Sequence, residues 1–376
     1  MNLKTVVTNY GIGDNSVLVV NRAILDGIVF SGLMARHGNL TYQGPSQTRN
    51  EYRSAGEYQA FCEAHGAPDV LIGQASYAAD VFQWAREHTP KTVRILQRDS
   101  THIRKWKELV DAEYERLGLD HRVGMGLVQH EEREYDLADA ITVLSRWVER
   151  SFIEKGLADK VRYVGAQTIM LDRWNPAPRK LDGVDFRLMV AGQIRIAKGT
   201  HLILKAWRKL KPPSNWELLL SGVWPDNNLP PDEFALIAEE YEKTRRTANV
   251  KLGSWCPIEH MHERFAQCDV YCLPSIQEGS SMTCVEALAC GRPLLASDRC
   301  GSDILEEHNG ECGEIFDVHD EDHLIDAIRR YAKDPELRAK HGERGRDLAV
   351  EYGGMPRFGR DFSLAVQKIW HEKATR

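Results

Sequence analysis

Short apolar runs rich in β-branched residues alternate with segments of helical periodicity, and the alternation restarts near the middle of the chain. In the first half, these runs are residues 5–8, 69–73, 92–96, 140–143 and 161–164. In the second half, they are residues 187–191, 216–220, 250–252, 270–273, 294–296 and 314–316. Strands that alternate with helices predict parallel sheets covered by helices on both faces. We therefore expect an α/β protein with two such sheets.

The length of 376 residues also favours two domains, because a single domain of this size is uncommon. Pro176 and Pro178 mark the best candidate for a linker. We predict an N-terminal domain, a linker, a C-terminal domain and a final helix, at residues 1–172, 173–182, 183–355 and 356–376. Within the first domain, the polar residues 37–54 predict a surface excursion, followed by a helix at residues 57–65.

Composition excludes several classes of protein. A formal net charge of -6 argues against nucleic acid as the main partner. The eight cysteines contain no Cys-x-x-Cys pair and have no paired histidines beside them, which argues against a zinc site and predicts buried free thiols. The first residues lack the pattern of a secretory signal, and the apolar residues 23–35 are too few to span a bilayer. These features predict a cytoplasmic, reduced protein.

A cluster of cations lies between residues 94 and 107. Its members are Arg94, Arg98, Arg104, Lys105 and Lys107. A solvated face is one interpretation, and a surface that binds an anionic acceptor or a membrane is the other.

Residues 273–293 combine a strand end, a loop and a short helix. The strand ends at Pro274, and helical spacing begins at Met282. Glu278 therefore lies in a loop at the carboxyl end of a strand, where open α/β sheets bind ligands, and Glu286 lies on the following helix.

Two interpretations of this stretch remain open. Backbone N–H groups at the helix start favour phosphate oxygens, and carboxylates accept hydrogen bonds from sugar hydroxyls. The residues that would offer these N–H groups are Gly279, Ser280, Ser281 and Met282. Alternatively, Thr283 and Glu286 form a capping box and Glu278 is a solvated loop residue.

Three other positions are candidates for the same chemistry. Gly13 closes a Gly-x-Gly turn where backbone can approach a phosphate or sugar, and His102 lies between a strand and a helix. Arg195 and Lys198 follow a strand and would stabilise the charge of a leaving phosphate. Each has a structural alternative, namely a tight turn, a buried histidine and solvent-exposed cations.

As a set, these residues resemble a known family. Gly192, Lys198-Gly199, Pro274-Ser275, Glu278-Gly279 and residues 286–293 resemble the Glu-x7-Glu signature of family 4 retaining glycosyltransferases. Residues 98–103 and 139–145 resemble parts of the family's first domain. The resemblance covers most of the chain, with residues 37–66 the least similar. It implies the GT-B fold, in which two Rossmann-like domains with parallel sheets face an interdomain cleft, and a final helix that crosses back to the first domain.

The resemblance also implies a role for each residue. Lys198, helped by Arg195, would contact the diphosphate of a nucleotide-sugar donor, and Glu286 would accept hydrogen bonds from its ribose. Glu278 would hold the transferred sugar and His102 would face it, while residues 279–282 would offer backbone donors and Gly13 would approach the diphosphate. The family often has Arg directly after the strand's glycine, whereas this chain has Gln193 there.

The function so implied is transfer of a sugar from a nucleotide diphosphate to an acceptor hydroxyl, with retention of the anomeric configuration. The acceptor would be a glycan, a lipid-linked molecule or a small metabolite. No metal and no further cofactor are expected. A peripheral position at the inner membrane face is the alternative to a purely cytoplasmic one. A catalytically silent nucleotide-sugar-binding scaffold, or an epimerase-like or phosphorylase-like enzyme, is the alternative function.

Overall fold

A computed structural model describes residues 4–8, 34–36, 47–165, 169, 171–176, 183–222, 229–254, 256–257, 260–352 and 354–374. The chain forms two compact units. Unit 1 comprises Met1–Lys105, Gly124–Thr168 and Met355–Arg376, and unit 2 comprises Trp106–Val123 and Ile169–Gly354. Trp106–Val123, which the sequence predicted as part of the N-terminal domain, thus packs within unit 2.

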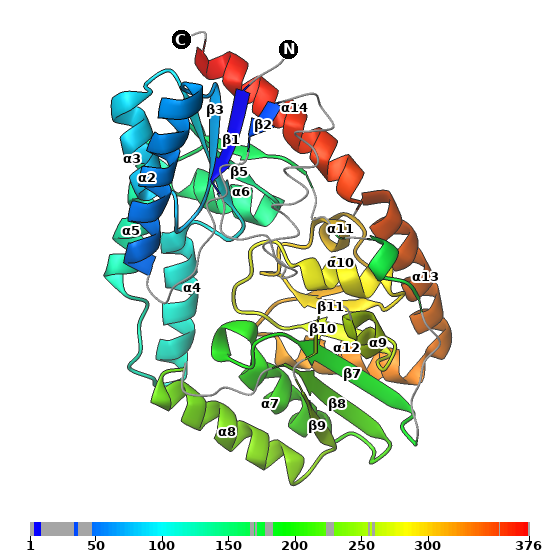
Figure 1. The fold of residues 1–376 in the computed structure, drawn as a ribbon. Helices are drawn as coiled ribbons and strands as arrows, with labels where there is room; N and C mark the ends of the chain where they lie inside the picture. The colour runs from blue at the N-terminus through cyan, green and yellow to red at the C-terminus, as the bar shows by residue number, and fades with distance from the viewer. Residues whose placement is uncertain are drawn as a thin grey trace. The chain divides into compact units, whose positions relative to one another are not determined.

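Unit 1 is built on a parallel sheet with the strand order β2-β1-β3-β4-β5-β6 (Figure 1). The strands are β1 (Lys4–Thr8), β2 (Met34–Arg36), β3 (Val70–Gln74), β4 (Val93–Arg98), β5 (Ala140–Val143) and β6 (Val161–Tyr163). Every residue of β3, β4 and β5 is buried, as their continuous apolar runs predicted.

Three helices lie beside this sheet, namely α2 (Gln47–His65), α3 (Ala79–His88) and α5 (Met125–Leu137) (Figure 1). Helix α3 packs between α2 and α5. Because α2 begins at Gln47, the helix start predicted at residue 57 is wrong, and residues from Gln47 on are helical where irregular chain was expected. Helix α6 (Arg146–Glu154) has the predicted N-cap, since the Val148 amide donates to Ser145 Oγ at 3.2 Å. Helix α14 (Met355–Ala374) buries Phe362, Val366 and Ile369 in unit 1, whereas Leu364 is 57% exposed.

Unit 2 has a second parallel sheet, with the order β12-β11-β10-β7-β8-β9. The strands are β7 (Phe186–Ala191), β8 (Trp216–Ser221), β9 (Val250–Gly253), β10 (Val270–Leu273), β11 (Leu294–Ser297) and β12 (Gly313–Phe316). Within this sheet β7 comes first in the sequence, and β8 and β9 follow on one side of it. The next strand, β10, lies on the other side of β7. This reversal creates a topological switch point at the carboxyl ends of β7 and β10, the position where open α/β sheets bind ligands.

The helices of unit 2 cover both faces of this sheet. They are η1 (Leu171–Arg173), η2 (Ile196–Lys198), α7 (Thr200–Leu210), α8 (Pro231–Arg245), α9 (Met261–Phe265), α10 (Met282–Ala289), α11 (Asp303–Glu307), α12 (Glu321–Lys333) and α13 (Pro335–Tyr352). Helix α7 packs against α8 and α12, whereas α10 packs against α13. Helix α4 (Ile103–Arg116) begins in unit 1, and its residues Val110 and Tyr114 enter the hydrophobic core of unit 2.

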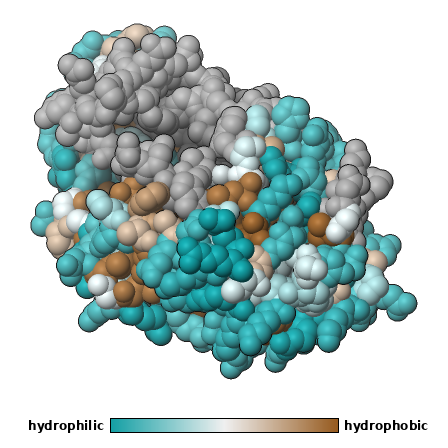
Figure 2. All heavy atoms as spheres, turned by 90° about the horizontal axis from the view of Figure 1, so that it is seen from below, coloured by the Kyte–Doolittle hydropathy of each residue, from teal (hydrophilic) through white to brown (hydrophobic). Residues whose placement is uncertain are grey.

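The predicted buried thiols are confirmed for most cysteines. All eight are free, and the buried ones are Cys268, Cys272, Cys284, Cys290, Cys300 and Cys312. No helix in the described ranges has the length and apolar character needed to cross a bilayer. Among the coloured residues in Figure 2, most are hydrophilic, and the hydrophobic ones gather in separate patches.

The predicted cationic cluster is divided between the interior and the surface. Arg94 and Arg98 are buried and pair with Asp139 and Glu131, at 2.8 and 2.9 Å. The surface cations Arg104, Lys105 and Lys107 pair with Glu132, Glu154 and Asp111. Each positive charge therefore has a nearby carboxylate, so the cluster is not a continuous basic face.

Candidate functional site

The loops that follow β7 and β10 meet at the topological switch point of unit 2. The Ile276 amide donates to the Ala197 carbonyl at 3.0 Å. Gly199 has a φ of 69°, and a Cβ at this position would overlap the carbonyl of Pro274. Glycine is therefore required there for two reasons, backbone conformation and close approach.

The structure brings two predicted site residues into direct contact. Lys198 Nζ on η2 donates to Glu278 Oε2 in the loop after β10. Ser275 Oγ donates to the same carboxylate oxygen at 3.4 Å, and the Glu278 amide donates to the Arg299 carbonyl at 3.0 Å. The Lys198 and Glu278 side chains are 30% and 19% exposed, so a ligand can reach both.

Glu286 differs from Glu278 in its surroundings. It lies on α10 and is 5% exposed, and burial raises the pKa of its carboxyl group to about 8. No described residue gives its carboxylate a hydrogen bond or an ion pair. Buried polar groups normally have partners, so a buried carboxyl group with none among the described residues needs an explanation.

The capping box is not present. The N-cap of α10 is Ser281, and Thr283 lies inside the helix. Thr283 Oγ1 instead accepts from Tyr271 Oη at 2.8 Å and lies 3.0 Å from Ser281 Oγ. Glu286 is thus free of the local role that the sequence allowed.

The predicted backbone donors lie at the amino end of α10. Gly279, Ser280 and Ser281 form the loop, and Met282 is the first helical residue. The positive end of the helix dipole is at this loop, which favours an anion. Tyr271, a buried residue of β10, fixes the helix start through Thr283.

Arg195 immediately precedes η2. Its amide donates to Thr200 Oγ1 at 3.1 Å, and its guanidinium Nε is 3.8 Å from Glu233 Oε1. The Arg195 side chain is 29% exposed, whereas Glu233 is fully buried. Sequence reasoning missed Glu233, although it lies four positions before the buried Ile237 on the same side of α8.

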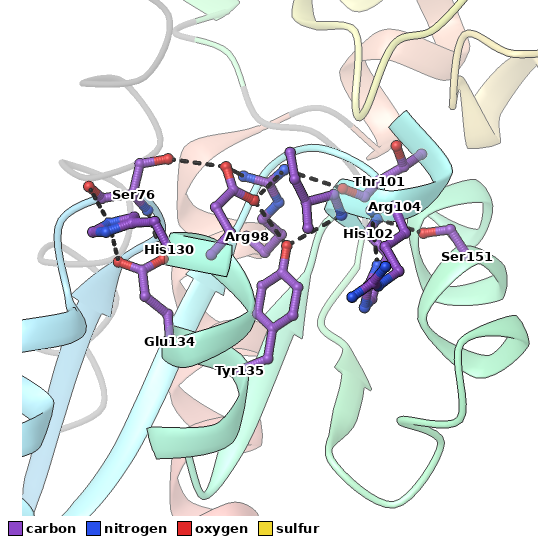
Figure 3. A network of polar contacts seen from close by, with 11 residues as sticks. Ser76, Arg98, Thr101, His102, Arg104, His130, Glu134, Tyr135 and Ser151 are labelled. Carbon is purple, nitrogen blue, oxygen red and sulfur yellow. Dashed lines mark hydrogen bonds and ion pairs between the residues drawn. The ribbon is translucent and has the colours of Figure 1, made fainter. Parts of the chain in front are cut away.

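His102, in unit 1, is a buried and neutral histidine. It is 3% exposed, and burial lowers the pKa of its imidazole to about 4. Its ring packs on Tyr135 and Phe152. The Arg104 amide donates to Nδ1 at 3.1 Å (Figure 3). Because Nδ1 accepts, the proton of the neutral ring is assigned to Nε2. His102 is therefore suited to donate a hydrogen bond near neutral pH, not to act as an acid.

A polar network that the sequence did not reveal fixes the loop after β3 (Figure 3). Ser76 has a φ of 75°, and its amide donates to Glu134 Oε2 at 2.7 Å. Ser76 Oγ donates to Glu131 Oε1 at 3.1 Å, and Glu131 also pairs with Arg98. Burial raises the pKa of Glu134 to about 7. The network holds strained backbone at the carboxyl edge of the unit 1 sheet, and such strain is often found at functional sites.

The structure brings some of the predicted site residues together but not all of them. Unit 2 gathers Arg195, Lys198, Glu278 and the start of α10 on adjoining loops, with Glu286 on α10 itself. His102 belongs to unit 1. Gly13 lies outside the described residues.

Comparison with known proteins gives this site a family context. Residues 175–348 match the family model of glycosyl transferases, group 1. The D-inositol 3-phosphate glycosyltransferase of Corynebacterium jeikeium is 25% identical over 317 residues, which cover 79% of this chain and 72% of that protein.

Solved structures with similar folds cover nearly the whole chain. Sucrose-phosphate synthase from Thermosynechococcus elongatus has a TM-score of 0.76 at 15% identity, covering 98% of this chain and 99% of that one. Anabaena HepE, solved in complex with UDP-glucose, has a TM-score of 0.69 at 11% identity, covering 98% and 100%. These similarities concern the fold, and they confirm the predicted GT-B architecture with two parallel α/β sheets.

Proposed function

We propose that this chain is a retaining glycosyltransferase that moves a sugar from a nucleotide diphosphate to an acceptor hydroxyl. The main support is Glu286, whose buried carboxyl group has no partner in the described part of unit 2. Hydroxyl groups of a ribose would supply the missing donors and favour the ionised form. A purely structural carboxyl group in this position would be buried without hydrogen-bond partners among the described residues, which is unfavourable.

Lys198 would bind the diphosphate of the donor, and Glu278 would bind the transferred sugar. In the ligand-free site, the ammonium and the carboxylate satisfy each other. A diphosphate carries more negative charge than one carboxylate and would draw Lys198 away from Glu278. Glu278 would then be released to accept hydrogen bonds from hydroxyls of the transferred sugar. This exchange couples recognition of phosphate and sugar, because neither group is available until the pair opens.

The leaving diphosphate would be stabilised by fixed positive charge. Lys198, Arg195 and the amino end of α10 lie on adjoining loops of unit 2. Cations and dipoles already in place stabilise developing charge without reorganisation. We propose that they do so without a metal ion, which predicts full activity in the presence of a chelator. His102 Nε2 would donate to a hydroxyl of the donor sugar.

The first experiment is calorimetry with UDP, GDP and ADP, starting with UDP because it is the nucleotide of the HepE complex. One of the three should bind, and Glu286→Ala should weaken that binding. Glu343→Ala, on the exposed surface of α13, is the matched control and should bind like the wild type. If none of the nucleotides binds, or if Glu286→Ala binds unchanged, the proposed donor site is wrong.

The second experiment identifies the reaction. The purified protein is incubated with sugar esters of the nucleotide that binds and with mixed acceptors, and NMR determines the anomeric configuration of the product. Transfer with retention supports the proposal, and an inverted product refutes it. Binding without transfer or hydrolysis would indicate a scaffold, whereas a changed sugar on an intact donor would indicate an epimerase.

A further inference from the structure

Glu233 is a buried carboxylate that contacts the loop carrying Arg195 and Lys198. It lies in the first turn of α8, and its exposure is 0%. Its Oε1 accepts a hydrogen bond from the Ile196 amide at 2.7 Å. Its Oε2 accepts from Tyr114 Oη at 2.6 Å. Both carboxylate oxygens are therefore engaged.

The contact with Ile196 fixes the start of η2. The first amides of a helix have no partner within the helix, and Arg195 offers no side-chain cap to this one. Glu233 supplies the missing acceptor from another helix. Since η2 is a single turn that ends at Lys198, its first amide sets the position from which the Lys198 side chain extends.

The same carboxylate also restrains Arg195. The guanidinium Nε lies 3.8 Å from Glu233 Oε1, too far for a hydrogen bond but close enough for attraction between the charges. This Nε is itself buried without a hydrogen-bond partner. Glu233 therefore sits between the backbone that presents Lys198 and the side chain of Arg195.

Tyr114 holds Glu233 through the second carboxylate oxygen. It is 1% exposed and belongs to Trp106–Val123, the inserted segment of unit 2. Burial, followed by the hydrogen bond to Glu233, raises the pKa of the Tyr114 phenol, which stays a donor at all ordinary pH values. The loop that carries Arg195 and Lys198 thus depends on a side chain that is distant in sequence and separate from the loop itself.

We propose that Glu233, held by Tyr114, is a positioning residue that fixes η2 so that Arg195 and Lys198 meet the donor diphosphate together. This inference rests on the proposed function, because it assumes that the loop binds a diphosphate. Glu233 would not touch the donor. Its effect would be confined to the phosphate part of recognition, since its contacts are with the loop that bears the two cations.

The sign of the effect separates positioning from simple electrostatics. Removing a negative charge beside Arg195, on the loop that also bears Lys198, would by charge alone tighten binding of a diphosphate. Loss of positioning would weaken it. Glu233→Ala removes both the charge and the acceptor, whereas Glu233→Gln removes the charge and keeps an acceptor for the Ile196 amide.

The test measures dissociation constants for a nucleoside and its diphosphate, using the base that the wild type prefers. Glu233→Ala should weaken diphosphate binding by about tenfold or more and leave nucleoside binding unchanged, because a buried amide loses its acceptor. Glu233→Gln should restore most of this loss. Tyr114→Phe keeps the ring and should weaken diphosphate binding by about threefold.

Glu239→Gln, a 64% exposed carboxylate on the same helix, is the control and should behave like the wild type. The inference is overturned if Glu233→Ala and Glu233→Gln both bind the diphosphate more tightly, or if nucleoside binding falls equally. Should Glu233→Ala not fold, unchanged diphosphate binding by Tyr114→Phe would overturn it. A wild type that binds neither ligand would instead refute the proposed function itself.

Discussion

The Glu286→Gln substitution is expected to separate stability from binding at the proposed donor site. Glutamine has nearly the same shape as glutamate and has no charge at any pH. Wild-type Glu286 is 5% exposed, and in the folded protein the pKa of its carboxyl group is raised by burial to about 8 from an ordinary 4.5. The folded state therefore retains this proton between pH 4.5 and 8, whereas the unfolded state loses it.

The magnitude of the effect follows from this difference. Because the unfolded state binds fewer protons in this range, the free energy of unfolding falls as pH rises from 4.5 to 8. At 1.36 kcal/mol for each pKa unit, the loss amounts to about 5 kcal/mol at pH 8 and above. The glutamine side chain of the variant would not ionise, so this contribution is absent from it. We expect similar stabilities near pH 4.5 and a variant more stable than the wild type at pH 9.

Urea unfolding followed by circular dichroism from pH 4.5 to 9 measures this difference. Glu343→Gln, an exposed substitution on α13, controls for the loss of one negative charge. Calorimetry on the same samples should show weaker nucleotide binding by Glu286→Gln, together with wild-type binding that strengthens as pH rises toward 8. If the stability difference between Glu286→Gln and the wild type does not change with pH, Glu286 does not have a raised pKa and the reasoning fails.

Three further predictions concern neighbouring parts of unit 2. Glu278→Ala should bind nucleoside diphosphates as well as the wild type or better, because Lys198 is released from its ion pair, but it should lose sugar transfer. Calorimetry measures the affinity and a transfer assay measures the activity. Weaker diphosphate binding would contradict the proposed exchange of partners. Gly199→Ala should lower the melting temperature measured by calorimetry, since alanine at a φ of 69° is strained and its Cβ meets Pro274; an unchanged value would mean that the loops separate easily. Burial would raise the pKa of Glu113, but hydrogen bonds from His201 and His319 lower it to about 2. Glu113 therefore adds about 3 kcal/mol to the free energy of unfolding above pH 4.5, and this contribution is lost as pH falls to 2. Acid unfolding of Glu113→Gln should therefore show a smaller loss of stability over this range than the wild type, and equal losses would contradict the prediction.

The fold was predictable because its signals are local and repeated. Continuous apolar runs predicted buried parallel strands, and β3, β4 and β5 are buried throughout. Helix starts were less predictable. The first residues of α2 are mostly polar, and the sequence therefore predicted that the helix starts at residue 57 and not at Gln47. Polar residues can continue a helix whose stability comes from packing further along.

The candidate site was predictable where chemistry and strand ends coincide. Lys198 and Glu278 each follow a strand, and the switch point between β7 and β10 explains why loops so distant in sequence meet. Their ion pair was not predictable, because it depends on the direction of two flexible side chains. The raised pKa of Glu286 was likewise hidden, since a glutamate on a short helix looks the same in sequence whether its carboxyl is buried or solvated.

Glu233 shows where sequence reasoning stops and what would extend it. Asp232 and Glu233 both follow Pro231 at the start of a helix, where acidic residues are expected to interact with the helix dipole. One is half-buried and the other is fully buried, because helical phase turns Glu233 toward the side that also buries Ile237. That phase is readable from the sequence. The hydrogen-bond donors to Glu233 cannot be read from the sequence, because they come from η2 and from Trp106–Val123, which only tertiary packing brings together. An acid on the buried side of a helix is therefore evidence of a donor elsewhere in the chain, as for Glu233, or in a ligand, as proposed for Glu286, because burying a carboxylate without a donor is costly.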